Sequence, residues 1–166
     1  MPDYDTSSLD GEEWRPVPGF DAWYEVSNLG RVKSLGTSRG HRPRILRQAI
    51  KQHGYRTVCL YRGDSRQRRI SVHRLVLTAF IGDCPSGYVA CHHNGDASDN
   101  RLANLYWGTV SQNQHDSVRH GTHRHTRKTH CPSGHPYDAS NTRVYRGRWR
   151  YCRTCQADRH RQERAS

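Results

Sequence analysis

The chain has 166 residues, of which only 33% are hydrophobic, and it carries a formal net charge of +12 at pH 7. This composition argues against one large core and favours small modules held together by metal. No apolar run approaches the roughly 18 residues of a membrane span, and the acidic N-terminus lacks the apolar stretch of a signal peptide. Six cysteines in a chain that is not secreted more often bind metal than form disulfides.

The charge is distributed in blocks along the chain. Residues 1–30 hold seven acids and one base, residues 31–74 hold thirteen bases and one acid, residues 75–120 hold two bases and four acids, and residues 121–166 hold eleven bases and three acids. Two basic blocks therefore flank a nearly neutral centre. They predict a polyanionic partner, because phosphate contacts supply most non-specific affinity for nucleic acids. The alternative is a basic surface that serves only solvation.

Residues 1–13 are predicted to be a flexible lead, and residues 14–72 a β-rich DNA-binding module. Within the module, Trp23–Val26 has the composition of a strand. Ser27–Gly30 is typical of a turn, and Arg31–Leu35 of the partner strand. The module therefore begins with a β-hairpin.

A second hairpin is predicted from residue 55 to residue 72. Apolar and polar residues alternate over 55–61, and Gly63-Asp64 forms the turn into the return strand. An arginine-lined ribbon of this kind fits the major groove of double-stranded DNA. The predicted DNA contacts of the module are Arg31, Lys33, Arg56, Arg62, Arg68 and Arg69.

The next predicted element is a helix that follows Ser71, a residue type suited to the N-cap. Gly82 and Pro85 are typical of its end. Its apolar residues recur at helical spacing and form one face: Val72, Leu75, Val76, Ala79 and Phe80.

The most informative stretch lies in residues 88–121. Tyr88–His92 and Leu105–Trp107 read as two strands, joined by a loop rich in asparagine, aspartate and glycine. Thr109 and Gln112 then form a capping box, which begins a helix that ends before Gly121.

On this strand, loop, strand and helix, the order His92, Asn104, Asn113 resembles the ββα-metal motif of the HNH nucleases, specifically the phage and intron homing-endonuclease branch. Residues 14–36, with Pro-Gly-Phe and Tyr-Glu-Val-Ser-Asn-Leu-Gly-Arg-Val, resemble the small module attached to many phage members. The resemblance implies that His92 is the general base, that Asn104 braces the loop and that Asn113 binds the catalytic cation. The chemistry is consistent, since a neutral histidine can take a proton from water and Mg²⁺ prefers oxygen ligands.

Cys91 departs from the family pattern, in which many homing members carry aspartate there as a second metal ligand. Cysteine is a poor ligand for Mg²⁺. Three interpretations stay open. The favoured one is that Asn113, phosphates and waters hold the cation; the others are that His93, His115 or Asp116 completes the site, or that a softer ion is bound with Cys91 as a ligand.

Residues 122–130 are predicted to be a polar linker, or alternatively a histidine-rich metal tract, and residues 131–166 a zinc-binding tail. Cys131 and His135, followed by Cys152 and Cys155, form two close pairs of nitrogen and sulfur ligands. This arrangement resembles the zinc-ribbon-like tail of some phage HNH proteins. A short basic helix over residues 156–164 is expected to follow, and the predicted DNA contacts of the tail include Arg143, Arg146, Arg148 and Arg150.

The sequence therefore predicts an α+β protein with a small β-sheet module at 14–72, a ββα-metal centre at 73–121 and a zinc knuckle at 131–166. The predicted function is a homing-type, nicking endonuclease that acts on double-stranded DNA as a monomer, with Mg²⁺ at the centre and Zn²⁺ in the tail. Its predicted location is the cytoplasm of a bacterial host, encoded by a phage, with no membrane partner. The alternatives are a DNA-binding protein with a degenerate centre, because of Cys91, and an RNA-processing nuclease.

Overall fold

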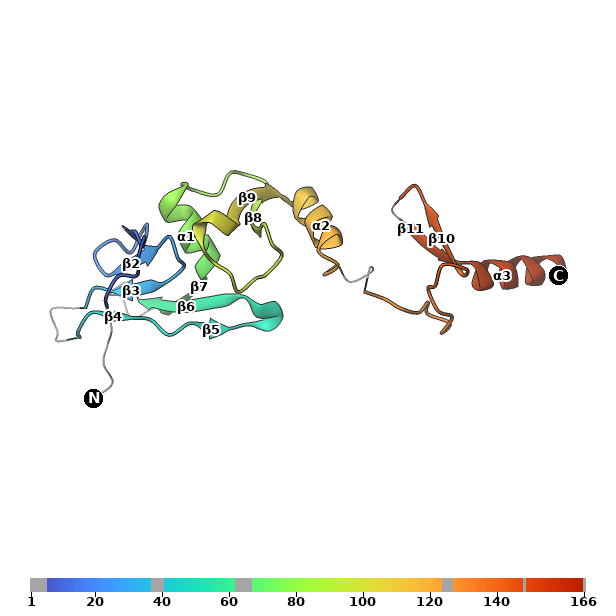
Figure 1. The fold of residues 1–166 in the computed structure, drawn as a ribbon, viewed down its shortest axis with the longest axis horizontal. Coiled ribbons are helices and arrows are strands. Elements are labelled where there is room, and N and C mark those ends of the chain that lie inside the picture. The colour runs from blue at the N-terminus through green and yellow to red at the C-terminus, as the bar shows by residue number, and fades with distance from the viewer. Residues whose placement is uncertain (1–5, 37–40, 62–66, 124–126, 148, 166) are drawn as a thin grey trace. The chain divides into compact units, whose positions relative to one another are not determined.

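In the computed structural model, the described residues are 6–36, 41–61, 67–123, 127–147 and 149–165. The chain divides into two compact units, Met1–His120 and Gly121–Ser166 (Figure 1). Arg62 and Arg148, two of the predicted DNA contacts, lie outside the described residues. The predicted modules at 14–72 and 73–121 both lie in the first unit, except for Gly121 at the end of the second module.

The first unit begins with an antiparallel sheet in the order β1-β2-β3-β4. Its strands are β1 (Trp14–Pro16), β2 (Tyr24–Ser27), β3 (Val32–Ser34) and β4 (Arg44–Ile45). The hairpin predicted from the turn at 27–30 is confirmed, with Val26 paired to Val32. Both of these valines are fully buried, so this hairpin supplies the first part of the core.

The segment that was predicted to be a flexible lead is held against this sheet over its described part. The backbone N–H of Glu13 donates to Asn28 Oδ1 at 3.0 Å, and Asn28 Nδ2 donates to the carbonyl of Gly11 at 3.0 Å. Glu12 forms an ion pair with Arg31 at 2.8 Å. Residues 11–13 are therefore fixed by side chains of the following hairpin, which composition alone does not reveal.

A second antiparallel sheet has the order β5-β6-β7. Its strands are β5 (Ala49–Ile50), β6 (Arg56–Tyr61) and β7 (Gln67–Ser71), and a short 3₁₀ turn, η1 (Gln52–Gly54), precedes β6. The two paired strands of the ribbon predicted from residue 55 are thus present, whereas its predicted turn at Gly63-Asp64 lies outside the described residues. Helix α1 (Val72–Phe80) follows β7 directly. Ser71 occupies the N-cap position as predicted, but its side chain makes no capping hydrogen bond.

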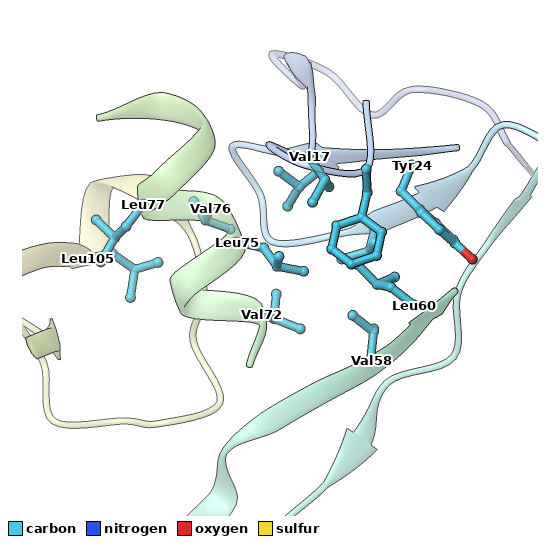
Figure 2. Close-up of a cluster of buried hydrophobic side chains, with 12 residues drawn as sticks. Val17, Tyr24, Val58, Leu60, Val72, Leu75, Val76, Leu77 and Leu105 are labelled. Carbon is cyan, nitrogen blue, oxygen red and sulfur yellow. The ribbon is translucent and has the colours of Figure 1, made fainter. Parts of the chain in front are cut away.

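Helix α1 lies at the centre of one shared core. Figure 2 shows Leu77 beside Leu105 on one side of the helix, and Val58 and Leu60 of β6 on its other side, toward Tyr24. In the first six residues of α1 only Arg74 is not buried. The buried residues are Val72, His73, Leu75, Val76 and Leu77. Because residues of the first sheet, of the second sheet, of α1 and of β9 meet in this core, the N-terminal module and the ββα segment are packed as one body.

The predicted strand, loop, strand and helix are confirmed. Strand β8 (Tyr88–His92) pairs with β9 (Leu105–Thr109), and a 3₁₀ turn, η2 (Leu102–Asn104), lies just before β9. Helix α2 (Val110–Arg119) begins at the predicted capping box, where Thr109 Oγ1 accepts from the N–H of Gln112 at 3.2 Å and Gln112 Oε1 accepts from the N–H of Thr109 at 2.8 Å.

The second unit consists of a hairpin and a helix. Strand β10 (Thr142–Tyr145) pairs with β11 (Trp149–Cys152), and α3 (Arg153–Ala165) follows at once. The helix begins three residues before the predicted start at 156, because Cys152 closes the strand and the chain turns directly into the helix. Within the described residues, none of the helices has the length and apolarity required to traverse a bilayer.

Candidate nuclease centre and metal site

The β8–β9 pair sets the position of His92 at the end of its strand, opposite Leu105. Because side chains alternate along a strand, Cys91 and His92 point to opposite faces. His92 faces α1 and the loop after β8, whereas Cys91 faces Tyr106 and Gly108. The two neighbouring residues therefore belong to different surroundings.

Asn104 is the centre of the loop between the two strands. Its Oδ1 accepts from the backbone N–H of Asn94 at 3.0 Å, and its Nδ2 donates to Asn94 Oδ1 at 3.0 Å and to the carbonyl of Asp99 at 2.9 Å. Its own carbonyl accepts from the N–H of His93 at 2.8 Å. These four hydrogen bonds join both ends of the loop directly behind His92.

His92 is buried, with 8% of its surface exposed, and it has two kinds of neighbour. Asn100 Oδ1 lies 3.4 Å from His92 Nε2; because a carbonyl oxygen only accepts, Nε2 carries the hydrogen and Nδ1 keeps its lone pair. The rings of His73 and Tyr55 lie 5.3 and 6.0 Å from the His92 ring, centre to centre. Burial lowers the pKa of His92, against the opposing effect of Asn100, so the ring is neutral at pH 7.

Cys91 is 1% exposed, and a Cβ on Gly108 would lie 3.0 Å from its Sγ. Burial raises the pKa of the thiol, so Cys91 is a protonated, closely packed side chain. Asp116 on α2 lies toward this face and accepts a hydrogen bond from the Tyr106 hydroxyl. It also pairs with Arg119 at 2.7 Å. Asp116, one of the side chains predicted as an alternative metal ligand, is thus already bound to two protein partners, Tyr106 and Arg119.

Asn113 is exposed at the beginning of α2, and no hydrogen bond links its side chain to another described residue. It lines a pocket of about 650 Å³ together with His73, Tyr55, Lys51 and Arg74. His92 is not one of the lining residues, but its ring lies against those of His73 and Tyr55. The predicted metal residue therefore lines a basic pocket that also borders His73, and Cys91 is not one of the residues that line it.

Two residues that sequence reasoning missed lie against His92: Asn100, whose Oδ1 is 3.4 Å from His92 Nε2, and His73, whose ring centre is 5.3 Å from that of His92. Asn100 is 4% exposed, and it packs against the turn at Gly30, where an added Cβ would lie 2.8 Å from both the Cβ and the carbonyl oxygen of Asn100. The N–H of Leu102 also donates to the carbonyl of Asn28 at 2.7 Å. The signals in the sequence that could have indicated these two residues were an asparagine, Asn100, in a polar loop and a histidine, His73, in an otherwise apolar helix.

The four predicted ligands of the tail come together. The metal-binding atoms of Cys131, His135, Cys152 and Cys155 all lie within 4.8 Å of one another, and the cysteines are free thiols. Cys131 Sγ lies 3.6 Å from His135 Nδ1 and 3.7 Å from Cys155 Sγ, and His135 Nδ1 lies 3.2 Å from Cys155 Sγ. This cluster is able to hold one metal ion.

Asn141 supports the cluster and was also missed. Its Oδ1 accepts from the N–H of Thr154 at 3.0 Å, and its Nδ2 lies 3.4 Å from Cys152 Sγ. The N–H of Cys155 donates to Cys152 Sγ at 3.5 Å, which lowers the pKa of that thiol to about 6. The backbone therefore favours the thiolate form that metals bind.

Some of the predicted DNA-contacting residues have a partner within the protein, and the others are exposed to solvent. In the first unit, Arg31 pairs with Glu12 at 2.8 Å, Lys33 pairs with Glu25 at 2.6 Å, and Arg56 Nε donates to the carbonyl of Ser98 at 3.3 Å. Arg150 of the tail lies over the Tyr137 ring at 4.7 Å. The side chains that remain exposed are Arg68, Arg69, Arg143 and Arg146.

Comparison with known proteins finds two family matches in the first unit. Residues 12–61 match the NUMOD4 motif, and residues 71–115 match the HNH endonuclease family. The DNA endonuclease I-HmuI of Bacillus phage SP01 is 31% identical over 110 residues, which cover 66% of this chain and 60% of that protein. The uncharacterized HNH endonuclease L247 of Acanthamoeba polyphaga mimivirus is 37% identical over 115 residues, which cover 67% of this chain and 27% of that protein.

A solved structure that describes DNA binding and cleavage by the HNH homing endonuclease I-HmuI is similar to this one. The TM-score is 0.56 at 31% identity, and the match covers 68% of this chain and 61% of the other. The chain thus spans about 60% of the length of I-HmuI. These matches place residues 71–115 in the HNH endonuclease family, preceded by a NUMOD4 motif at residues 12–61.

Proposed function

We propose that this protein is a homing-type, divalent-metal-dependent endonuclease that hydrolyses phosphodiester bonds in double-stranded DNA. The observation that carries the proposal is the buried, neutral His92, held by Asn100 on a loop that Asn104 closes. A relative at 31% identity is named a DNA endonuclease, which supports the same reaction class. We further propose that it nicks one strand as a monomer in the cytoplasm of a phage-infected bacterium.

In this proposal His92 is the general base. With Nε2–H directed at Asn100 Oδ1, Nδ1 accepts a proton from the water that attacks phosphorus. Because burial lowers the pKa of His92, the ring remains in its basic, neutral form at physiological pH. Asn104 does not contact the reacting atoms; it positions His92 by fixing the loop that begins at His93.

Asn113 is the side chain that would hold the catalytic Mg²⁺. Its exposed amide lacks a hydrogen-bond partner among the described residues, and it faces a pocket with room for a phosphate group. A hard cation such as Mg²⁺ can take an amide oxygen as a ligand beside phosphate and water oxygens. The protonated thiol of Cys91 is a poor ligand for such a cation. When bound, the cation stabilises negative charge on the phosphate and on the leaving oxygen.

The tail is proposed to bind one structural Zn²⁺ through Cys131, His135, Cys152 and Cys155. Zinc bonds of about 2.3 Å to sulfur and about 2.0 Å to nitrogen place tetrahedral ligand atoms roughly 3.5–3.8 Å apart. The separations of 3.6, 3.7 and 3.2 Å in the cluster are close to these values. The soft donor set is also the one that zinc prefers.

DNA contacts are proposed for the exposed basic residues of both units. Arg68 and Arg69 of β7 would lie along the duplex, and Arg143 and Arg146 of the tail would contact phosphates. Arg31, Lys33, Arg56 and Arg150 have partners within the protein, so their contribution to binding would require those contacts to be shared or exchanged.

A cleavage assay on a pool of supercoiled plasmids that carry random inserts tests the proposal and requires no defined target sequence. With Mg²⁺ we expect conversion to nicked circles, no conversion with EDTA, and a shared sequence at the mapped breaks. Asn113→Ala should require more Mg²⁺ or lose cleavage, whereas the exposed neighbour variant Gln114→Ala should not. Binding without cleavage would instead support a degenerate centre, and preferential cutting of RNA hairpins would support the RNA-processing alternative.

A further inference from the structure

His73 is a buried histidine that the proposed mechanism does not yet use. It is the second residue of α1 and is 7% exposed. Its Nδ1 is shielded from solvent and has no hydrogen-bond partner within the described residues. Buried polar atoms are nearly always paired, so an unpaired one at this depth needs a reason.

The surroundings of His73 place it in direct contact with the proposed base. Its ring centre lies 5.3 Å from that of His92, at an interplanar angle of 69°, and 5.3 Å from that of Tyr55. His92 is therefore bounded by Asn100 at Nε2 and by the ring of His73. Both histidines come from rigid elements, α1 and the end of β8, so their separation is fixed by the shared core.

The ionisation of His73 follows from its burial. Burial, followed by the neighbouring His92 and Arg74, lowers its pKa to about 4, so the ring is neutral at pH 7 and carries one hydrogen. An N–H left unpaired in the interior costs about 1–3 kcal/mol. The favoured tautomer thus keeps a bare lone pair on the shielded Nδ1 and carries its hydrogen on Nε2, which is the nitrogen left to meet a ligand.

The space that His73 borders suits a phosphate group. The pocket of about 650 Å³ is lined by His73 and Asn113, and by the cations Lys51 and Arg74. A phosphate bound in this pocket would be bordered by both Asn113 and His73. The pocket thus combines the proposed metal residue, two positive charges and one neutral ring N–H donor.

We propose that His73 is a further catalytic residue, whose Nε2–H donates a hydrogen bond to a non-bridging oxygen of the DNA phosphate that is cleaved. The proposal rests on the proposed endonuclease function. In this arrangement His92 takes the proton from water while His73 stabilises the charge that grows on the phosphate oxygens. One preorganised donor of this type contributes on the order of 10²–10³ in rate.

Three substitutions separate this role from packing. His73→Phe keeps the ring volume and removes both nitrogens, His73→Gln places an amide N–H near the position of Nε2, and His73→Asn places one near Nδ1. Cleavage of plasmid DNA is measured under single turnover at saturating enzyme, DNA affinity is measured without divalent cation, and unfolding in urea reports folding. We expect a loss of about 100-fold for Phe and Asn, a loss within about tenfold for Gln, and unchanged affinity for all three.

The outcomes are distinguishable. Equal rates for the Gln and Phe variants, or a Phe variant close to the wild type, would overturn the role of His73 while leaving the endonuclease function intact. A wild-type protein that does not cleave would refute the proposed function itself. A readout independent of cleavage is the ¹⁵N NMR spectrum of the imidazoles, in which we expect the Nε2–H tautomer for His73; the Nδ1–H tautomer would contradict the proposal.

Discussion

Replacing Gly30 by alanine is expected to reduce both folding stability and cleavage, although Gly30 lies in the N-terminal module and far in sequence from His92. Gly30 has a φ of +81°, where a Cβ costs about 1–2 kcal/mol. The added methyl would also lie 2.8 Å from the Cβ and the carbonyl oxygen of Asn100, and overpacking of this kind costs about 1–3 kcal/mol. The unfolding free energy should therefore fall by about 2–5 kcal/mol in total.

The matched control is Gly19→Ala. Gly19 has a φ of +78°, and an added Cβ there meets nothing within 4 Å, so only the conformational cost of about 1–2 kcal/mol applies. The difference between the two variants isolates the collision with Asn100. Because Asn100 holds Nε2 of His92, and a displacement of about 1 Å at a reacting group can cost about 100-fold in rate, only Gly30→Ala should slow cleavage strongly.

The assay combines urea unfolding with single-turnover cleavage, measured under urea-free conditions where both variants are folded. We expect Gly30→Ala to be less stable than Gly19→Ala by about 1–3 kcal/mol and to cleave at least tenfold more slowly. If the two variants match in stability and rate, the turn does not support Asn100 as described, and the coupling between the module and the loop is refuted.

Three further changes have defined outcomes. Chelation of the tail metal should release about one zinc ion per chain and unfold residues 131–158, as followed by elemental analysis and circular dichroism; protein purified without chelator that contains no zinc would contradict this. Asn104→Ala should leave the N–H of Asn94 unpaired, at a cost of about 1–3 kcal/mol, and slow cleavage more than it lowers affinity, whereas a variant with wild-type kinetics would show that the loop does not depend on it. The pKa of His73 is about 4 in the folded state and about 6.5 when unfolded, so between these pH values the unfolded chain binds more protons than the folded one. The free energy of unfolding should therefore fall as the pH drops from about 6.5 to 4. In urea titrations at several pH values, His73→Phe should show a smaller fall than the wild type.

Local patterns in the sequence were sufficient for the elements with short-range causes. The capping box at Thr109 and Gln112, the hairpin around residues 27–30 and the ligand set beginning at Cys131 each depend on residues close together in the chain or on a specific chemical spacing. In each case the side chains of nearby residues, or the ligand types that a metal prefers, are sufficient to decide the local structure.

Contacts between distant segments could not be predicted in this way. Arg31 was expected to contact DNA because it begins a basic block, but its partner Glu12 comes from the acidic lead. The burial of His73 could not be predicted, because the burial of a polar residue depends on what packs over it in the fold. The same limit applies to Gly30 and Asn100, which are 70 positions apart and meet only in the fold.

The role of His92 as general base carries the proposed chemistry. The most direct test compares His92→Ala with His93→Ala in single-turnover cleavage of the mapped DNA target with Mg²⁺. His92 is buried beside His73 and Asn100, whereas His93 is exposed and stacks on Tyr106 at 4.3 Å. We predict a loss of at least about 100-fold for His92→Ala, with DNA affinity retained, and a rate near that of the wild type for His93→Ala. Undiminished cleavage by His92→Ala, or an equal loss in both variants, would contradict the assignment of His92 as the base.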